Sequence, residues 1–336
     1  MNDDSINKQL ISVVAPVFNE EAVLDEFYRT LCETLDTLPY RFEIIFVDDG
    51  SQDDSLKAMH DLRTQDTRIS IIELSRNFGK EIALTAGLDH CQGEAAIIID
   101  TDLQDPPELI EDMLQEWQNG YQVVYAKRLT REGETWTKKL SSYLFYRVIQ
   151  RIAKFDIPED TGDFRLLDRT VVDAITQLRE QHRFMKGLFS WVGYRQKAIP
   201  FDRKPRHAGT SKWSYWRLWN FALEGITSFS TAPLRIATYL GLFTALSAFV
   251  FGLYIIYDTL IWGNPIPGYP SLMVVVLFLG GVQLISIGII GEYLGRLFDE
   301  TKQRPLYLIK HHWLNGDSAN QTTNNATTTS HTPSSD

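Results

Sequence analysis

The chain has 336 residues, which is long enough for one large domain or two smaller ones. Its formal net charge of −10 argues against a general nucleic-acid-binding protein, although local basic patches are present. The two cysteines, Cys32 and Cys91, lack the spacing of metal or redox motifs, so we expect no disulfide framework. The acidic segment 1–4 lacks an apolar signal core and predicts no cleaved signal peptide.

Residues 10–126 alternate between short apolar segments and amphipathic ones. We predict strands at 10–15, 42–47, 69–74, 95–99 and 121–126, the first of them ended by Pro16. Helices are predicted after Asn19 and Ser51 and at 79–91 and 107–119. Strands that alternate with helices favour a mainly parallel α/β sheet covered by helices. In such sheets ligands bind beyond the carboxyl ends of the strands.

Two carboxylates, Asp100 and Asp102, directly follow the predicted strand at 95–99. Side chains two residues apart in an extended segment point the same way, so both carboxylates can converge on one cation, and Gln104 adds a third oxygen. Oxygen ligands suit Mg²⁺ or Mn²⁺ bridging a substrate diphosphate. The alternative is a solvated turn at a strand end. A second acidic pair, Asp48 and Asp49, ends another predicted strand, and this agreement favours a nucleotide–metal site.

Glycine-rich phosphate-binding motifs are absent from the sequence. No Gly-x-Gly-x-x-Gly follows the first predicted strand, and no Walker-type loop with Lys-Ser/Thr occurs. A dinucleotide dehydrogenase and a P-loop NTPase are therefore disfavoured. A bound diphosphate has to be held by a metal ion and cationic side chains instead.

Between residues 136 and 230 the chain changes character. Segment 136–155 combines an apolar stripe at helical spacing with a basic line and predicts a helix at an anionic membrane surface; an ordinary surface helix is the alternative. Asp163 and Arg165 lie in a predicted Gly-containing turn at 161–165. The cation-rich loop at 201–213 can wrap a phosphate, or it is a solvated basic loop. Tryptophans and a tyrosine at 213–219 are typical of a membrane interface, and we expect a second amphipathic helix near 213–230.

Two uncharged apolar segments, 236–257 and 271–291, are each long enough to cross a membrane. Buried helices of a soluble protein are the alternative, which the length and all-round apolarity of the segments disfavour. The connector 258–270 has no Lys or Arg, whereas both outer flanks do, so the positive-inside rule predicts a cytoplasmic location for both termini. Glycines in the second segment would allow close helix approach and suit a homo-oligomer.

We therefore divide the chain into four parts. A cytoplasmic α/β domain at 1–232 is followed by two transmembrane helices within 233–295, a cytoplasmic segment at 296–314, and a disordered tail at 315–336 that is rich in Asn, Ser and Thr.

Five ordered motifs closely resemble one enzyme family. They are the segments 16–21 (PVFNEE), 47–51 (VDDGS), 75–80 (SRNFGK), 100–104 (DTDLQ) and 209–212 (GTSK). Together they resemble the polyprenyl-phosphate glycosyltransferases of glycosyltransferase family 2, of the bacterial bactoprenol glucosyltransferase type, with dolichyl-phosphate mannose synthases as more distant relatives. The resemblance spans nearly all of residues 10–308.

The resemblance implies a GT-A catalytic domain with two membrane helices, and inverting transfer of a sugar from a nucleotide diphosphate onto polyprenyl phosphate. It implies Mg²⁺ or Mn²⁺ held by Asp102 and Gln104 with Asp100 close by, and Asp163 near the reacting centre. Donor-binding residues carried over from the motifs are Pro16, Phe18, Glu20, Asp49, Asp100 and Arg128, and cations that would grip phosphates are Arg203, Arg206 and Lys212. The absence of a Gln-x-x-Arg-Trp motif favours a single transfer over processive synthesis.

The sugar is not identified by any residue in the sequence. Overall resemblance favours UDP-glucose, while a UDP-aminoarabinose derivative, UDP-N-acetylglucosamine and GDP-mannose stay open. Two other classes also stay open: a lipid-carrier binding or translocating protein without catalysis, and a membrane-anchored sugar-nucleotide hydrolase. The intact Asp-x-Asp site argues against the former.

Overall fold

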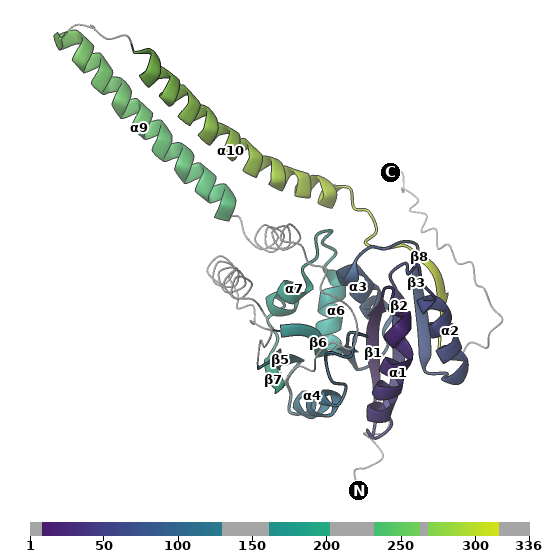
Figure 1. Cartoon of the computed structure of the whole chain (residues 1–336). Coiled ribbons are helices and arrows are strands. Elements are labelled where there is room, and N and C mark those ends of the chain that lie inside the picture. The colour runs from purple at the N-terminus through teal and green to yellow at the C-terminus, as the bar shows by residue number, and fades with distance from the viewer. Residues whose placement is uncertain (1–8, 130–160, 202–231, 263–267, 316–336) are drawn as a thin grey trace, which may run out of the picture.

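The computed structural model describes residues 9–129, 161–201, 232–262 and 268–315 (Figure 1). An eight-stranded sheet in the order β7-β5-β6-β4-β1-β2-β3-β8 forms the centre of an α/β domain, and two long helices project away from that domain (Figure 1). The predicted amphipathic helices at 136–155 and 213–230, and the tail from residue 316 onward, lie outside the described residues.

Most strands of the sheet are parallel, which confirms the predicted α/β class. The parallel strands are β1 (Leu10–Val17), β2 (Arg41–Asp48), β3 (Ile69–Leu74), β4 (Ala95–Ile98), β5 (Val123–Arg128) and β7 (Gln196–Phe201). Two strands are antiparallel to their neighbours. β6 (Thr161–Asp168) lies between β4 and β5, and β8 (Ile309–Trp313) pairs with the edge of β3.

Helices cover both faces of the sheet. One face packs against α1 (Glu21–Leu35), α2 (Ser55–Gln65) and α4 (Leu109–Gln118), and the other against α3 (Lys80–His90), α6 (Arg169–Gln177) and α7 (Met185–Trp191). Successive residues of a central strand therefore both point into apolar layers. Ile97 faces the first core and Ile98 the second, and both are fully buried. This two-sided burial explains why the strand is continuously apolar rather than alternating.

Two local predictions were wrong. β1 does not end at Pro16 but continues to Val17, with Pro16 paired in register to Val47 of β2. Pro16 is tolerated because β4 pairs with β1 only as far as Val14, so no ladder on that side needs a Pro16 N–H. Residues 161–165 form the start of strand β6 rather than a turn, because they pair with β5 and continue into a register with β4.

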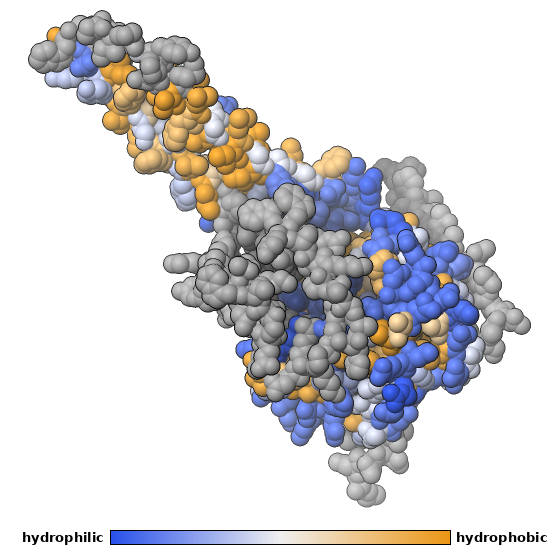
Figure 2. Space-filling model, viewed as in Figure 1, coloured by the Kyte–Doolittle hydropathy of each residue, from blue (hydrophilic) through white to orange (hydrophobic). Residues whose placement is uncertain are grey.

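The two projecting helices are α9 (Ala232–Trp262) and α10 (Tyr269–Thr301), and both are long and apolar enough to cross a membrane. Figure 2 shows apolar residues covering this hairpin, whereas hydrophilic residues dominate the visible described surface of the α/β domain. The large apolar side chains of α9 and α10 are mostly exposed, which disfavours the interpretation of these helices as buried helices of a soluble protein. A Cβ added at Gly280, Gly281 or Gly288 would meet nothing within 4 Å, so these glycines do not mediate the α9–α10 contact.

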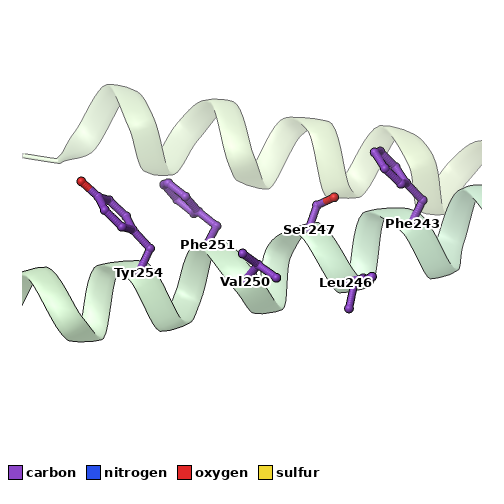
Figure 3. A pocket seen from close by; sticks show the side chains of 6 residues that line it. All are labelled: Phe243, Leu246, Ser247, Val250, Phe251 and Tyr254. Carbon is purple, nitrogen blue, oxygen red and sulfur yellow. The ribbon is translucent and has the colours of Figure 1, made fainter.

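An apolar groove of about 540 Å³ runs along the hairpin. Phe243, Ser247, Phe251 and Tyr254 point from α9 toward α10, while Leu246 points away (Figure 3). None of the described residues that line this groove is charged. The groove belongs to the helical hairpin and not to the polar edge of the sheet.

After α10 the chain returns to the α/β domain. The Ser75 N–H donates to Leu308 O at 2.9 Å, and β8 then pairs with β3. The end of α10 also contacts the α6–α7 connection, where the Gln181 N–H donates to Glu300 Oε1 at 2.8 Å. The segment predicted only as a cytoplasmic extension therefore supplies the last strand of the sheet.

Candidate active site

One edge of the sheet collects the predicted site residues. The carboxyl ends of β1, β2, β4 and β5 meet there, and because β6 is antiparallel, its first residues reach the same edge. The described site residues brought to this edge are Pro16, Phe18, Glu20, Asp49, Asp100, Asp102, Gln104, Arg128 and Asp163. Arg203, Arg206 and Lys212 lie outside the described residues.

The ends of β1 and β2 form one connected polar rim. Asn19, with a positive φ of 56°, accepts a hydrogen bond at Oδ1 from the Gln52 N–H at 2.8 Å, and its own N–H donates to Ser51 Oγ at 3.1 Å. The Glu20 N–H donates to Ser55 Oγ at 2.9 Å. Phe18 beside this rim keeps an exposed fraction of 42%, which leaves an apolar ring open to a ligand.

Asp49 is buried and fixes the loop that follows β3. Its carboxylate accepts the N–H of Phe78 at 2.7 Å and that of Gly79 at 2.9 Å. Burial raises the pKa of Asp49, although these two hydrogen bonds oppose the shift. Gly50 is required next to it, because its φ is +72° and a Cβ there would lie 2.7 Å from the backbone of Arg76 and Asn77.

The Asp100–Gln104 motif lies beyond β4, in a turn and not in an extended strand, so the extended backbone predicted for this motif was wrong. That its side chains converge on a cation stays a prediction. Asp102 Oδ1 accepts the Gln104 N–H at 3.2 Å inside this turn. Leu103 has a left-handed φ of 55°, which costs a non-glycine residue about 1–2 kcal/mol. Backbone strain of this kind is concentrated at functional sites.

Lys80, the first residue of α3, joins two of the site carboxylates. Its Nζ donates to Asp100 Oδ2 at 2.7 Å and also to Asp163 Oδ2. Burial by itself would raise the pKa of Asp163, but Lys80, with Lys186 and Arg165, holds that pKa well below its usual range. Burial raises the pKa of Asp100, and Lys80 opposes this shift. The buried Oδ1 atoms of Asp100 and Asp163 have no hydrogen-bond partner among the described residues.

A second layer of charge lies beneath these carboxylates. Arg165 is buried over the Phe189 ring, with Cζ 3.9 Å from the ring centroid, and its Nη2 donates to Gly162 O at 2.9 Å. Burial lowers the pKa of Arg165 to about 10. Burial and the nearby Asp163 raise the pKa of Glu81 to about 7, and Glu81 Oε2 accepts the Met185 N–H at 3.2 Å.

Arg128, at the end of β5, lies beside the start of β6. Its Nη2 is 3.8 Å from the buried Asp105 carboxylate, and a Cβ at Gly162 would lie 3.4 Å from both groups. The Arg128–Asp105 pair therefore packs directly against the backbone at Gly162, next to Asp163. The guanidinium of Arg128 therefore lies at the same edge of the sheet as the Asp100–Gln104 turn.

The donor set at this edge fits a hard divalent cation. Asp100 Oδ1 is a buried carboxylate oxygen without a hydrogen-bond partner, and Asp102 and Gln104 follow it in the same turn. Within the described ranges, no group of three or more His, Cys, Asp or Glu side chains could hold a metal. A cation here would thus need oxygens from a diphosphate and water besides these residues, as Mg²⁺ and Mn²⁺ sites on substrates do.

Three residues of the site were not assigned from the sequence. Lys80 is the last residue of the 75–80 motif, but no role was predicted for it. Glu81 and Asp105 were not predicted as site residues. A signal was present for Lys80, because several carboxylates gathered at one strand-end site favour a positive charge beside them. Its partners come from β4 and β6, and the pairing of those strands was not predicted.

The comparisons with known proteins agree with this geometry. Residues 12–176 match the family model described as glycosyl transferase family 2, and residues 232–297 match the GtrB C-terminal hairpin. An uncharacterized glycosyltransferase of Synechocystis is 54% identical, over 90% of this chain and 95% of the relative. The bactoprenol glucosyl transferase of Shigella phage SfV is 50% identical over 89% and 98%, and the prophage homolog of that enzyme in Escherichia coli K12 is 48% identical over 89% and 98%. The mainly parallel sheet with its carboxylate edge is thus a GT-A-like fold, and the chain belongs to glycosyltransferase family 2.

Proposed function

We propose that this glycosyltransferase moves one glucose unit from UDP-glucose onto polyprenyl phosphate, most simply undecaprenyl phosphate, with inversion at the anomeric carbon. The bactoprenol glucosyl transferase of Shigella phage SfV and its prophage homolog, both at about half identity over nearly their whole length, support the lipid acceptor and the sugar. The hairpin of α9 and α10 supports a membrane location, which an acceptor with a long apolar tail requires.

The proposed reaction is one displacement. An anionic oxygen of the lipid phosphate forms a bond to the anomeric carbon, and the bond from that carbon to the UDP oxygen breaks, so that the electron pair leaves with UDP. No proton has to be removed from the nucleophile, because the phosphate is already ionised near neutral pH. The barrier therefore lies in bringing two anions together and in stabilising the leaving diphosphate.

The observation that carries the proposal is a pair of carboxylate oxygens without a hydrogen-bond partner among the described residues, one on Asp100 and one on Asp163, on either side of Lys80. In this assignment Asp100, Asp102 and Gln104 hold Mg²⁺ or Mn²⁺, which would supply Lewis-acid stabilisation of the diphosphate. Pro16, Phe18, Glu20 and Asp49 form the base and ribose side, and Asp49 acts there by fixing the loop at Gly79. Arg128, Arg203, Arg206 and Lys212 are assigned to the phosphates.

Asp163 is assigned an orienting role in this reaction rather than that of a general base. It is an ion-paired carboxylate whose pKa lies well below its usual range, so it is a weak proton acceptor. The partnerless Oδ1 suits a hydrogen bond from a sugar hydroxyl. This assignment agrees with a nucleophile that needs no deprotonation.

We place the catalytic domain and both termini on the cytoplasmic side of the membrane, with the short connector outside. Arg235 flanks one span, Arg296, Lys302 and Arg304 flank the other, and 258–270 carries no Lys or Arg. This side is also where nucleotide sugars are available to a bacterial enzyme. A homo-oligomer formed through the hairpin remains part of the proposal, since the hairpin's exposed apolar faces would need a lipid or protein environment.

A product analysis tests the proposal. Membranes containing the chain are given labelled UDP-glucose, UDP-N-acetylglucosamine, a UDP-aminoarabinose derivative or GDP-mannose, with undecaprenyl phosphate. Lipid-linked glucose as the main product is expected, and a different labelled lipid would replace glucose in the proposal. Free sugar as the only product would indicate a hydrolase, and no turnover of any donor would indicate a lipid-carrier binding protein.

A further inference from the structure

We propose that Lys80 is a positioning residue, which ties the donor-side carboxylate of Asp100 to the carboxylate of Asp163 at the reacting side and thereby sets their spacing. The inference rests on the proposed function, since it deepens the account of that same site. Lys80 supplies a single ammonium group to carboxylates on two different elements, the segment after β4 and the start of β6.

The way in which oxygens are shared supports this role. Lys80 takes one oxygen, Oδ2, from each carboxylate and leaves both Oδ1 atoms buried and without a hydrogen-bond partner among the described residues. Buried carboxylate oxygens are costly when they have no partner, so the arrangement is complete only when a ligand supplies one. Lys80 thus holds the two groups while leaving each of them one oxygen for substrate.

The fold itself has little use for this lysine. Lys80 is the first residue of α3, where the helix dipole disfavours a positive charge. Its side chain keeps 42% of its surface exposed, so the ammonium group stays accessible at the site instead of being enclosed by the fold. A residue whose charge is unfavourable for its helix, yet which is held by two carboxylates, is better explained by its place in the site.

The backbone of Lys80 is also held from the nucleotide side. Asp49 accepts the N–H groups of Phe78 and Gly79, the two residues that directly precede Lys80. A chain of contacts therefore runs from the end of β2, through the start of α3, to the carboxylates at β4 and β6. Lys80 is the point where the donor side and the reacting side of the site are joined.

Kinetics of a double-mutant cycle test the inference. Lys80→Met, Asp163→Asn and the double variant are compared in the lipid-linked transfer assay. Misplaced reactants are expected to lower kcat in Lys80→Met about 10²-fold, with KM for the donor changed far less. Because Lys80 acts in part through Asp163, the loss in the double variant should be smaller than the product of the two single losses, and Lys80→Arg should recover part of kcat. Fully multiplicative losses, or a kcat in Lys80→Met close to wild type, would overturn the inference.

Lys197→Met is the matched control. Lys197 has the same 42% exposed side chain and a carboxylate neighbour, Glu116, at 3.9 Å, but it lies at the start of β7, at the opposite end of the sheet. It should keep wild-type kinetics. Lys80→Met should remain folded at the assay temperature, and a loss of activity that only follows unfolding would reduce Lys80 to a structural residue.

Hydrogen–deuterium exchange without substrates separates this inference from the proposed function. Exchange at 99–105 and 161–165 should be at least about threefold faster in Lys80→Met than in wild type or Lys197→Met, because two carboxylates without their bridge repel each other. Unchanged exchange would overturn the bridge whatever reaction the enzyme performs. Faster exchange together with a wild type that transfers no sugar would retain the bridge and reject the proposed function.

Discussion

The carboxylate of Asp49 holds the backbone of Gly79, with Oδ2 accepting the Gly79 N–H at 2.9 Å while Oδ1 accepts that of Phe78. A residue that the sequence assigns to nucleotide binding therefore also shapes the loop between β3 and α3. In this family 2 glycosyltransferase, the geometry of the loop after β3 and that of the lysine at the start of α3 depend on one buried carboxylate.

Asp49→Asn should test this dual role. An amide replaces one acceptor oxygen by a donor, so one of the two backbone N–H groups loses its partner, at a cost of roughly 1–3 kcal/mol in the free energy of unfolding. Denaturation of the detergent-solubilised protein measures the loss. Asp36→Asn is the control, because Asp36 pairs with Arg68 at 2.8 Å but is 61% exposed. Equal stabilities of the two variants would contradict a structural role for Asp49.

Metal removal should abolish transfer. EDTA is expected to stop the reaction, and Mg²⁺ or Mn²⁺ to restore it, because the leaving diphosphate would lose its charge stabilisation. Asp102→Ala should lower activity by about 10²-fold or more at every metal concentration. Initial rates of lipid-linked sugar formation measure both effects. Full activity of Asp102→Ala in saturating Mn²⁺ would remove Asp102 from the metal site.

Asp163 offers a test between orientation and general-base catalysis. Because Lys80 keeps the pKa of Asp163 well below its usual range, the carboxylate stays ionised across the neutral and mildly acidic range. The pH–rate profile of wild type should therefore lack an acid limb attributable to this group. Asp163→Asn should retain more activity than Asp163→Ala, since the amide keeps shape and some hydrogen bonding. Two equally inactive variants, together with an acid limb in wild type, would point to a base.

Glu81 should make the stability of the protein depend on pH. Its pKa in the folded protein is raised to about 7 from an ordinary 4.5, chiefly by burial and then by Asp163. Between these values the folded state binds more protons than the unfolded one, so stability falls as pH rises and the loss is complete above about pH 7. Glu81→Gln should remove this slope and gain up to about 3 kcal/mol near pH 8. Thermal unfolding of wild type and Glu81→Gln from about pH 5 to pH 8 measures this pH dependence of stability. The same pH dependence in both proteins would contradict a raised pKa for Glu81.

Topology can be measured directly. Reporters fused before Leu10 and after Trp313 should both report the cytoplasm, and a reporter inserted near Gly268 should report the outside, because α9 and α10 form two spans. The paired β3 and β8 independently require residues 69–74 and 309–313 to lie on one side. Opposite compartments for the two termini would exclude an even number of spans.

Elements defined by local patterns were predictable from the sequence. β3 begins and ends at the predicted residues, and α1 follows Asn19 as predicted, with Leu24, Phe27 and Leu31 buried. Strands defined by their partners were not predicted. β8 reads Ile-Lys-His-His-Trp, and its polar side chains make sense only beside β3, where Lys310 and His311 both donate to Glu73. β7 contains Pro200, which an edge strand tolerates but which weakens any strand signal.

The candidate site was likewise predictable from the sequence only in part. The strand-end carboxylates were predictable because the carboxyl edge of a parallel sheet follows from the alternation of strands and helices. The turn at Asp100–Gln104 and the strand at Asp163 were not, since Leu103 adopts a left-handed backbone and β6 is placed by its neighbours. The Lys80 bridge depends on both of these placements, and no local sequence pattern contains it.

The return of the chain to β8 affects how the protein is made. The ribosome must synthesise α9 and α10 before residues 309–313, so the catalytic sheet gains its last strand only after both apolar helices have emerged. Until then β3 is an exposed edge, the kind of surface on which nascent chains aggregate. Completion of the enzyme is thereby timed to follow synthesis of its membrane anchor, and a chain truncated before residue 309 would leave that edge permanently open (Figure 1).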